Sequence, residues 1–143
     1  MTGNKHDAED ILQEAFYLAF VNFNKLKKIE SFGAWLKKIV VNKCISFLRK
    51  QIHFVDIEST NHELSEDDED WMHELSMTEI NHEIQQLPDG CRIVFNLFLL
   101  ENYSHKQIAE LLGISESTSK SQYHRAKSIL RTQLKKKLHY GQV

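Results

Sequence analysis

The sequence has 143 residues and a formal net charge of −2, with one proline, five glycines and two cysteines. That length suits one ordinary domain or two small ones. Apolar residues recur at helical rather than alternating spacing, so we predict an all-α fold. No apolar run approaches the roughly 20 residues of a membrane span, and no basic-then-apolar leader is present, so we expect a cytoplasmic protein without a membrane span.

The small net charge conceals a sharp segregation. Residues 1–50 have a balance of +4, residues 51–86 a balance of −11, and residues 87–143 a balance of +5. Two basic blocks separated by an acidic one indicate two modules that face nucleic acid and a connector between them. We therefore place the domains at residues 1–52 and 74–140, with an acidic linker at 53–73.

The first predicted helix begins at Asp7, which we expect to be its N-cap, with Glu9 and Asp10 in the first turn. Its apolar residues, between Ile11 and Phe23, cover more than one stripe of the helix. A helix that is apolar nearly all round has to be buried on several sides.

A second helix is predicted at residues 32–51, after a lysine-rich connector and a cap at Ser31. Its apolar residues follow i, i+3, i+4 spacing, while lysines, arginine and asparagine lie outside that stripe. Two interpretations stay open for this basic surface. It is either a solvated lysine face or, because aromatic residues are interleaved with the bases, a surface that stacks on unpaired nucleotides.

The acidic stretch of the linker lacks helical periodicity, which is typical of a solvated or disordered segment. A helical stripe resumes at residues 74–87, through Met77, Ile80, Ile84 and Leu87. Pro88 then suits the start of another helix. On that helix we expect five residues to face a core. They are Cys91, Val94, Phe95, Phe98 and Leu99. We expect Cys44 and Cys91 to be buried free thiols rather than a disulfide or a metal pair.

Residues 103–130 carry the signals of a helix-turn-helix. Ser104 and Gln107 form a capping box at the start of a short helix. Gly113 is suited to the left-handed residue that ends this helix, and Ser115 caps a second, longer one. Two helices joined by such a short glycine turn are typical of DNA-binding proteins, in which the second helix enters the major groove.

The second of these helices has two distinct sides. Ser119, Tyr123, Ala126, Leu130 and Leu134 fall on the side that faces the scaffold. The outer side holds donors and cations but no carboxylate, as suits a surface that meets a polyanion. It comprises Ser117, Lys120, Ser121, His124, Arg125, Ser128 and Arg131. The plain alternative is a solvated basic face of an amphipathic helix.

We find no enzyme motif in the sequence. The eight histidines do not form the spacing of a metal site, and no phosphate-binding glycine loop or nucleophile elbow is present. The acidic pairs lie mostly in the aperiodic linker, which cannot hold them at a fixed separation. We therefore expect no catalytic residues, no metal and no cofactor.

Three segments in this order resemble the bacterial RNA polymerase sigma factors. They are HDAEDILQEAF, then FGAWLKKIVVNKCISFLRK, then LPDGCRIVFNLFLLENYSHKQIAELLGISESTSKSQYHRAK. The two-domain form looks like the extracytoplasmic-function (ECF) group. The resemblance implies a sigma factor that binds core RNA polymerase and directs promoter recognition in transcription initiation, together with an anti-sigma factor as a partner.

The resemblance also implies a role for particular residues. Those that stand where the family docks on polymerase are Asp7, Glu9, Asp10, Gln13, Glu14 and Phe16. Those implied to contact the opened −10 element are Asn24, Lys25, Trp35, Lys38, Asn42 and Arg49. Those implied to read the −35 element are Ser115, Ser117, Thr118, Lys120, Ser121, Gln122, His124 and Arg125.

The sequence also departs from the family's pattern. Ser119 stands where the family usually has a small apolar core residue, Gln122 replaces a frequent arginine, and Ser46 replaces a frequent aspartate. The family has further helices before the one at Asp7, so we expect an N-terminally truncated protein whose first helix has more apolar surface than partners. Two other functions stay open: a stand-alone helix-turn-helix regulator, and an interaction module that binds an anti-sigma partner without binding DNA.

Overall fold

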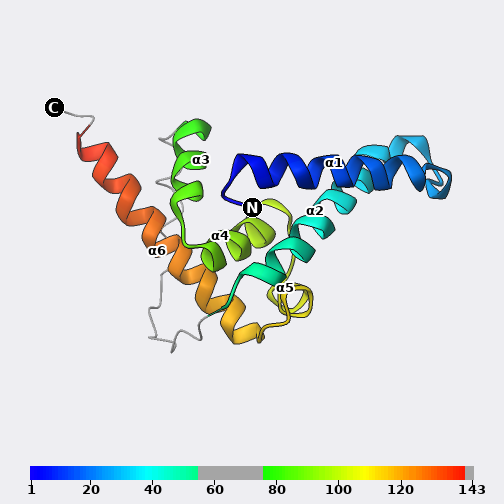
Figure 1. Ribbon diagram of the computed structural model, residues 1–143. Helices are drawn as coiled ribbons and strands as arrows, with labels where there is room; N and C mark the ends of the chain where they lie inside the picture. Colours follow the sequence, from blue (N-terminus) through cyan, green and yellow to red (C-terminus); the bar gives the residue numbers. More distant parts are fainter. Residues whose placement is uncertain (55–75, 141–143) are drawn as a thin grey trace. The chain divides into compact units, whose positions relative to one another are not determined.

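A computed structural model describes residues 1–54 and 76–140, and all regular structure in these ranges is helical (Figure 1). The all-α prediction is confirmed. Contacts divide the chain into an N-terminal unit, Thr2–His53, and a C-terminal unit, Phe54–Val143 together with Met1. The predicted linker, 53–73, lies outside the described residues except for its first two. The start of the helix predicted at 74 also lies outside them. In the ranges above, no helix combines the length and the hydropathy needed to cross a membrane.

The N-terminal unit is built on two helices packed against each other, α1 (Lys5–Val21) and α2 (Phe32–Gln51). Two short 3-10 turns, η1 (Phe23–Lys25) and η2 (Ile29–Ser31), lie between them. The buried side chains follow one stripe of each helix: Ile11, Ala15 and Ala19 on α1, and Val41, Ile45 and Leu48 on α2. The other apolar side chains of α1 are exposed or half-buried, so within this unit the helix is buried on one side only.

The N-cap of α1 differs from the predicted one, and the N-cap of α2 lacks the expected side-chain hydrogen bond. Asn4, in an extended conformation, is the N-cap of α1, and its Oδ1 accepts from the His6 amide at 2.8 Å. Asp7 therefore lies in the first turn rather than before it. Ser31 stands at the N-cap position of α2, as predicted, but its side chain makes no capping hydrogen bond, and its hydroxyl donates to the Lys28 carbonyl at 2.7 Å.

The C-terminal unit packs its shorter helices against one long one, α6 (Glu116–Tyr140). The shorter helices are α3 (Met77–Gln86), α4 (Asp89–Phe95) and α5 (His105–Leu112), and a π-helical turn, η5 (Asn96–Leu100), follows α4. Residues from α4, η5, α5 and α6 meet in one core. Its largest fully buried side chains are Phe95, Ile93, Leu97, Ile108, Leu130, Leu134, Val94 and Cys91.

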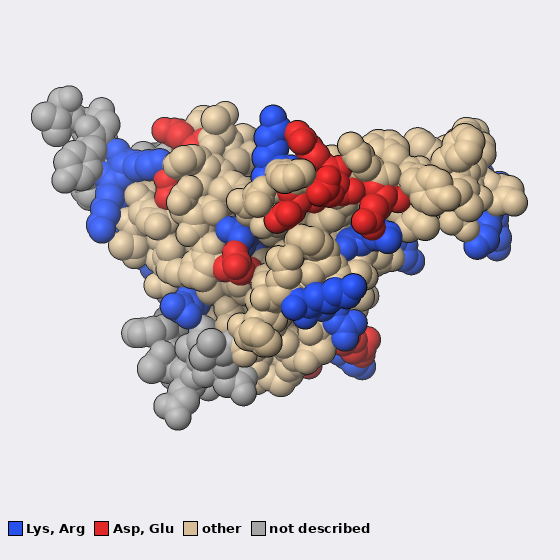
Figure 2. All heavy atoms as spheres, viewed as in Figure 1, with Lys and Arg blue, Asp and Glu red and all other residues tan. Residues whose placement is uncertain are grey.

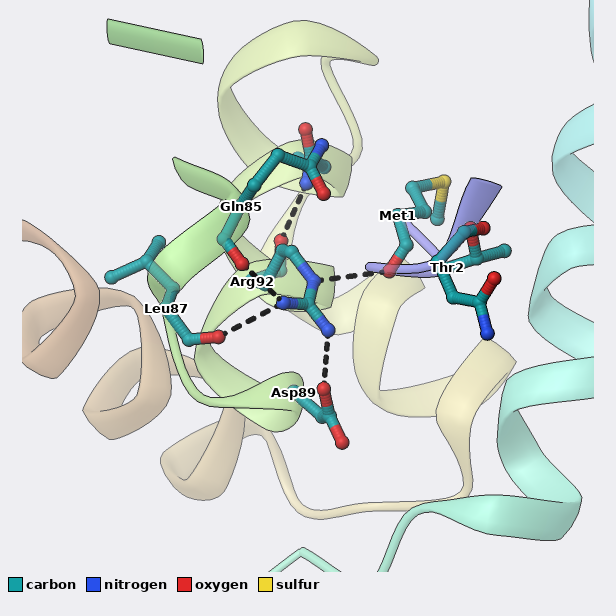
Figure 3. A network of polar contacts seen from close by, with 8 residues as sticks. Met1, Thr2, Gln85, Leu87, Asp89 and Arg92 are labelled. Carbon is teal, nitrogen blue, oxygen red and sulfur yellow. Dashed lines mark hydrogen bonds and ion pairs between the residues drawn. The ribbon is translucent and has the colours of Figure 1, made fainter. Parts of the chain in front are cut away.

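A buried arginine holds the end of α3 against the start of α4 (Figure 3). Nη1 of Arg92 donates to the carbonyl oxygens of Gln85 at 2.8 Å and of Leu87 at 3.0 Å, and Nη2 pairs with the Asp89 carboxylate. The last carbonyls of a helix have no partner within the helix. Arg92 therefore satisfies the C-terminal end of α3 from inside the unit.

One residue of a predicted apolar stripe, Met77, and one predicted core residue, Leu99, are exposed instead. Met77 opens α3 directly after its N-cap, Ser76, and its side chain is largely exposed there. Leu99 lies in η5, where the Glu101 amide donates to the Asn96 carbonyl five residues earlier. A π turn holds more residues than the α turn it replaces, and this changes the direction of the side chains that follow. Leu99 consequently points away from the core that its spacing predicted.

Candidate nucleic-acid interface

The helix-turn-helix signals of the sequence are present in the C-terminal unit. The Gln107 amide donates to Ser104 Oγ at 3.2 Å, and the Ser104 amide donates to Gln107 Oε1 at 2.8 Å. Gly113 ends α5 in the left-handed region, with φ 68° and ψ 36°. The predicted capping box and the predicted glycine stop are both confirmed.

The start of α6 is fixed by its own cap. The Thr118 amide donates to Ser115 Oγ at 2.9 Å, and the two hydroxyl oxygens lie 2.8 Å apart. The cap prediction for Ser115 is confirmed. Because the Ser115 hydroxyl satisfies an amide that would otherwise lack a partner, the first turn of α6 starts at a defined point after the Gly113 turn.

The outer side of α6 presents the expected polar groups. Ser117, Lys120, His124, Arg125 and Ser128 are exposed, and Ser121 and Arg131 are half-buried. On this outer side the exposed cations, Lys120 and Arg125, lie within the first three turns of the helix, next to the α5–α6 turn. This end of a recognition helix is the one that approaches base edges in the major groove.

Two residues implied to read DNA lie inside the unit instead. Thr118 and Gln122 are only 6% and 4% exposed. The Gln122 amide oxygen accepts from Cys91 Sγ at 3.1 Å, which ties α6 to α4. The structure therefore corrects the expectation that these two side chains face DNA. Both cysteines are free thiols, Cys91 fully buried and Cys44 half-buried.

A carboxylate also lies beside the basic face. Glu116 Oε1 is 3.1 Å from Nζ of Lys120, one turn further along α6. Since the sequence interpretation counted no carboxylate on this face, this is a second correction. The pair is exposed, so it contributes little to stability, but it reduces the positive charge that Lys120 offers to a phosphate.

A functional candidate that the sequence analysis missed is His105, the first residue of α5. Its ring stacks on Phe98, with 4.3 Å between ring centroids, and its Nδ1 lies 2.9 Å from Ser119 Oγ on α6. Burial, followed by the charges of Lys120 and His124, lowers the pKa of His105 below its ordinary value. The sequence signal that could have pointed to His105 is Ser119, because a polar residue on the buried side of a helix needs a polar partner.

In the N-terminal unit, the residues implied to contact opened DNA lie on η1 and α2. Asn24 and Lys25 are exposed on η1. Lys38, Asn42 and Arg49 are exposed on α2, and their spacing puts them on one face of that helix. Trp35 is half-buried and belongs to an aromatic cluster with Phe32 and Phe23, in which neighbouring ring centroids are 6.2 Å apart.

The residues implied to dock on polymerase lie along α1, where acidic side chains gather on the surface (Figure 2). Asp7 is half-buried, while Glu9, Asp10, Gln13, Glu14 and Phe16 are exposed. Glu14 forms an ion pair with Lys43 of α2, at 3.1 Å. This pair borders a hollow of about 430 Å³ that Gln13, Tyr17 and Leu18 also line.

The C-terminal half of α1, after the acidic residues, exposes apolar side chains. Phe16, Tyr17 and Phe20 are 56%, 69% and 83% exposed, and Val21 is exposed beside them. Exposed apolar side chains gathered on one helix are typical of surfaces that bind a protein partner.

Two family matches follow one another along the chain. Sigma-70 region 2 matches residues 1–53, and Sigma-70, region 4 matches residues 77–130. The ECF RNA polymerase sigma factor SigW of Bacillus subtilis (strain 168) is 35% identical over 149 residues, which cover 94% of this chain and 79% of that protein. The chain belongs to the ECF sigma factors.

A second sigma factor and a solved structure agree with this assignment. RNA polymerase sigma factor SigV of Bacillus subtilis (strain 168) is 32% identical over 135 residues, covering 93% of this chain and 79% of that protein. Among solved structures, the sigma factor RpoE of Bartonella quintana, in a co-crystal with the anti-sigma factor NepR, gives a TM-score of 0.53 at 25% identity. That match covers 92% of this chain and 83% of RpoE.

The resemblance stated from the sequence is thereby confirmed. An ECF sigma factor is not an enzyme; it binds core RNA polymerase and promoter DNA and directs transcription initiation. The order of the two matches is also the order of the two units, since region 2 coincides with the N-terminal unit and region 4 lies within the C-terminal unit.

Proposed function

We propose that this ECF sigma factor contacts one promoter at two places, with residues 74–140 reading the −35 element and residues 1–52 holding the opened −10 element. The acidic stretch 53–73 links these two domains. The observation that carries the proposal is the exposed basic start of α6, which two confirmed caps and a glycine turn fix in a helix-turn-helix.

At the −35 element, the proposed contacts divide between bases and phosphates. Ser117, Lys120 and Ser121 lie nearest the start of α6, so these side chains meet base edges. His124 and Arg125 follow one turn later and meet phosphates. Thr118 and Gln122 act indirectly, because they are buried and hold the helix in place.

At the −10 element, the proposed surface is the exposed face of α2 with η1. Lys38, Asn42 and Arg49 supply donors and positive charge along α2, and Asn24 and Lys25 extend the surface onto η1. Promoter opening of this kind requires no hydrolysis. Capture of a flipped base shifts the opening equilibrium of the duplex, and stacking on an aromatic ring such as Trp35 contributes roughly 1–3 kcal/mol per base.

Core polymerase is proposed to bind α1 through its acidic residues and its exposed aromatic face. Glu9, Asp10 and Gln13 present polar groups, and Phe16 supplies an apolar anchor beside them. We also propose that the protein acts in the cytoplasm and is held inactive by an anti-sigma factor. The RpoE structure, in which a sigma factor is bound by NepR, supports the last point.

The decisive experiment is run-off transcription with purified core RNA polymerase on a library of promoters. We expect transcripts from a subset of promoters only when this protein is added. Arg125→Ala should lower their yield severalfold, because it removes one phosphate contact. Lys135→Ala is the matched control, since it removes the same charge from the same helix about 15 Å further along. Absence of any protein-dependent transcript would refute the proposal.

The two alternatives make different predictions. A stand-alone regulator would bind duplex DNA but would not co-purify with core polymerase. A module that only binds an anti-sigma partner would keep its affinity for DNA unchanged, at a negligible level, in Lys120→Ala and Arg125→Ala. Neither alternative accounts for the region 2 match over residues 1–53.

A further inference from the structure

Helix α1 carries a row of large apolar side chains outside its buried stripe. Leu12, Phe16 and Phe20 follow one another at four-residue spacing, so they share one side of the helix, and all three are exposed. Phe23, which is also exposed, continues this outer row into η1. A row at three- and four-residue spacing is the geometry through which one helix packs along another.

The outer row and its neighbours are large enough to support association. Taking about 200 Å² for a whole aromatic residue, the exposed parts of Phe16, Tyr17, Phe20 and Phe23 amount to roughly 500 Å² in one copy. Leu12 beside them is 41% exposed. Two copies that cover these residues on each other bury about 1,200 Å² in total, which is the lower limit of the range for specific protein interfaces.

The two ends of the outer row differ in charge. Glu9 and Asp10, both exposed, lie before it on α1, whereas Lys27 and Lys28, also exposed, lie beyond it with Glu30 beside them. The two acids have basic partners one turn back, at 3.7 and 3.8 Å, but exposed pairs of this kind are weak. An antiparallel pair of α1 helices sets the acids of one copy against the lysines of the other. A parallel pair would set acids against acids, so the charges favour a second copy in the antiparallel orientation.

We propose that the outer row of α1 joins two copies of this chain in an antiparallel, two-fold dimer. Phe16 and Phe20 of each copy lie at its centre, and the acidic end of each α1 faces the lysines of the other copy. The same face is the one proposed to bind core polymerase, so the dimer and the polymerase complex exclude each other. That consequence rests on the proposed function, whereas the pairing itself does not.

The pairing is tested by sedimentation velocity of the full chain, from about 1 to about 200 µM. We expect a reversible dimer with a Kd in the micromolar range, as suits an interface at the lower size limit. Phe16→Ser/Phe20→Ser should raise this Kd at least tenfold. The matched control is Leu99→Ser/Leu100→Ser, which removes two exposed apolar side chains from η5 and should leave the Kd unchanged. Circular dichroism checks that each variant is folded.

Three results of this experiment would overturn the proposal. The first is a parent protein that stays monomeric at about 200 µM. The second is a series of ever larger species, because a two-fold contact closes at two copies. The third is an equal loss of association in the α1 variant and in the η5 control, which would show that any exposed apolar pair has the same effect.

The antiparallel orientation is tested by charge reversal at exposed positions, which leaves the apolar row intact. Lys27→Glu/Lys28→Glu and Glu9→Lys/Asp10→Lys should each weaken the dimer about threefold or more at low salt, and the two reversals combined should restore it. In a parallel pair, like charges face each other before and after either reversal, so neither change would matter. An unchanged Kd, or a combined variant weaker than both of its parents, would contradict the antiparallel dimer.

The competition with polymerase is measured by adding purified core RNA polymerase to the labelled dimer. We expect the dimer to disappear in step with a complex that contains one copy of this chain. Phe16→Ser/Phe20→Ser should weaken both assemblies. A core complex that still contains two copies would overturn the competition, and with it the proposed docking of polymerase on this face. Sedimentation without polymerase decides the pairing separately, so the two failures are distinguishable.

Discussion

The thiol of Cys91 on α4 donates to the amide oxygen of Gln122 on α6, across 3.1 Å of buried space. The same amide oxygen lies 3.3 Å from the point where a Cβ would stand on Gly90, so the space around it is tightly filled. Gln122 is thus part of the packing between α4 and α6. Its neighbours Ser121 and His124 lie on the outer side of α6.

We predict that Gln122→Ala destabilises the C-terminal unit without weakening its electrostatic contact with DNA. The change leaves the Cys91 thiol without its acceptor and opens a small cavity, which costs about 1–3 kcal/mol. Urea unfolding gives the stability, and DNA affinity at several salt concentrations gives the number of phosphate contacts. A loss of DNA affinity in Gln122→Ala under conditions where the variant is fully folded would show that its side chain does reach the DNA.

Arg125→Ala is predicted to have the complementary effect. Its side chain is exposed, so stability should change by less than about 0.5 kcal/mol. The slope of log affinity against log salt concentration should fall by about one unit, because one phosphate contact is lost. Lys135→Ala, on the same helix, should leave the slope unchanged. Equal slopes for all three proteins would mean that the basic face is merely solvated.

Removing the carboxylate beside Lys120 should strengthen DNA binding. Glu116→Gln frees the Lys120 ammonium from its 3.1 Å partner and removes a negative charge from the surface that faces phosphates. We expect a several-fold gain in affinity at low salt, which fades as salt screens the charges. Glu110→Gln on α5 is the control, because it removes an exposed carboxylate from the other helix of the helix-turn-helix. A gain of the same size in the control would contradict a specific role for the pair.

Arg92 is predicted to be the most sensitive polar residue of the C-terminal unit. Arg92→Ala leaves the carbonyls of Gln85 and Leu87 without their donor, at a cost of about 3–5 kcal/mol. Arg92→Lys keeps the charge but cannot reproduce the fork of donors, so it should recover only part of this stability. Urea unfolding followed by circular dichroism measures both variants, and equal stability of parent and Arg92→Ala would disprove the role of this network.

Two glycine-to-alanine substitutions should have different effects on stability. Gly113 has a φ of 68°, where an alanine is strained, so Gly113→Ala should cost about 1 kcal/mol. Gly33 lies in the first turn of α2 with open space around its Cβ position, so Gly33→Ala should be neutral or stabilising by up to about 1 kcal/mol. Thermal unfolding of each variant checks this pair of predictions, and a similar loss in both would be inconsistent with the turn geometry.

Features that depend on neighbouring residues could be predicted from the sequence alone. The capping box at Ser104, the stop at Gly113, the cap at Ser115 and the extent of α2 each depend on residues within a few positions of one another, and all four were predicted correctly.

The features that were missed or misplaced depend mostly on contacts between residues distant in the sequence. Gln122 was assigned to DNA from the family resemblance, and nothing in the sequence pointed to its partner Cys91, which is 31 positions away. His105 was overlooked because Ser119 lies on another helix. The misplacement of Leu99 has a different origin, since a π turn breaks the regular spacing on which the prediction relied.

The separate cores of the two units also bear on how this protein can change over generations. Ile11, Ala15 and Ile45 are buried within one unit, and Phe95, Ile108 and Leu130 within the other. Compensating substitutions in either interior can therefore accumulate without a matching change in the other. Recombination that exchanges one half of the gene with a relative would leave both interiors intact, which offers a route to new promoter specificities without the loss of an existing polymerase contact.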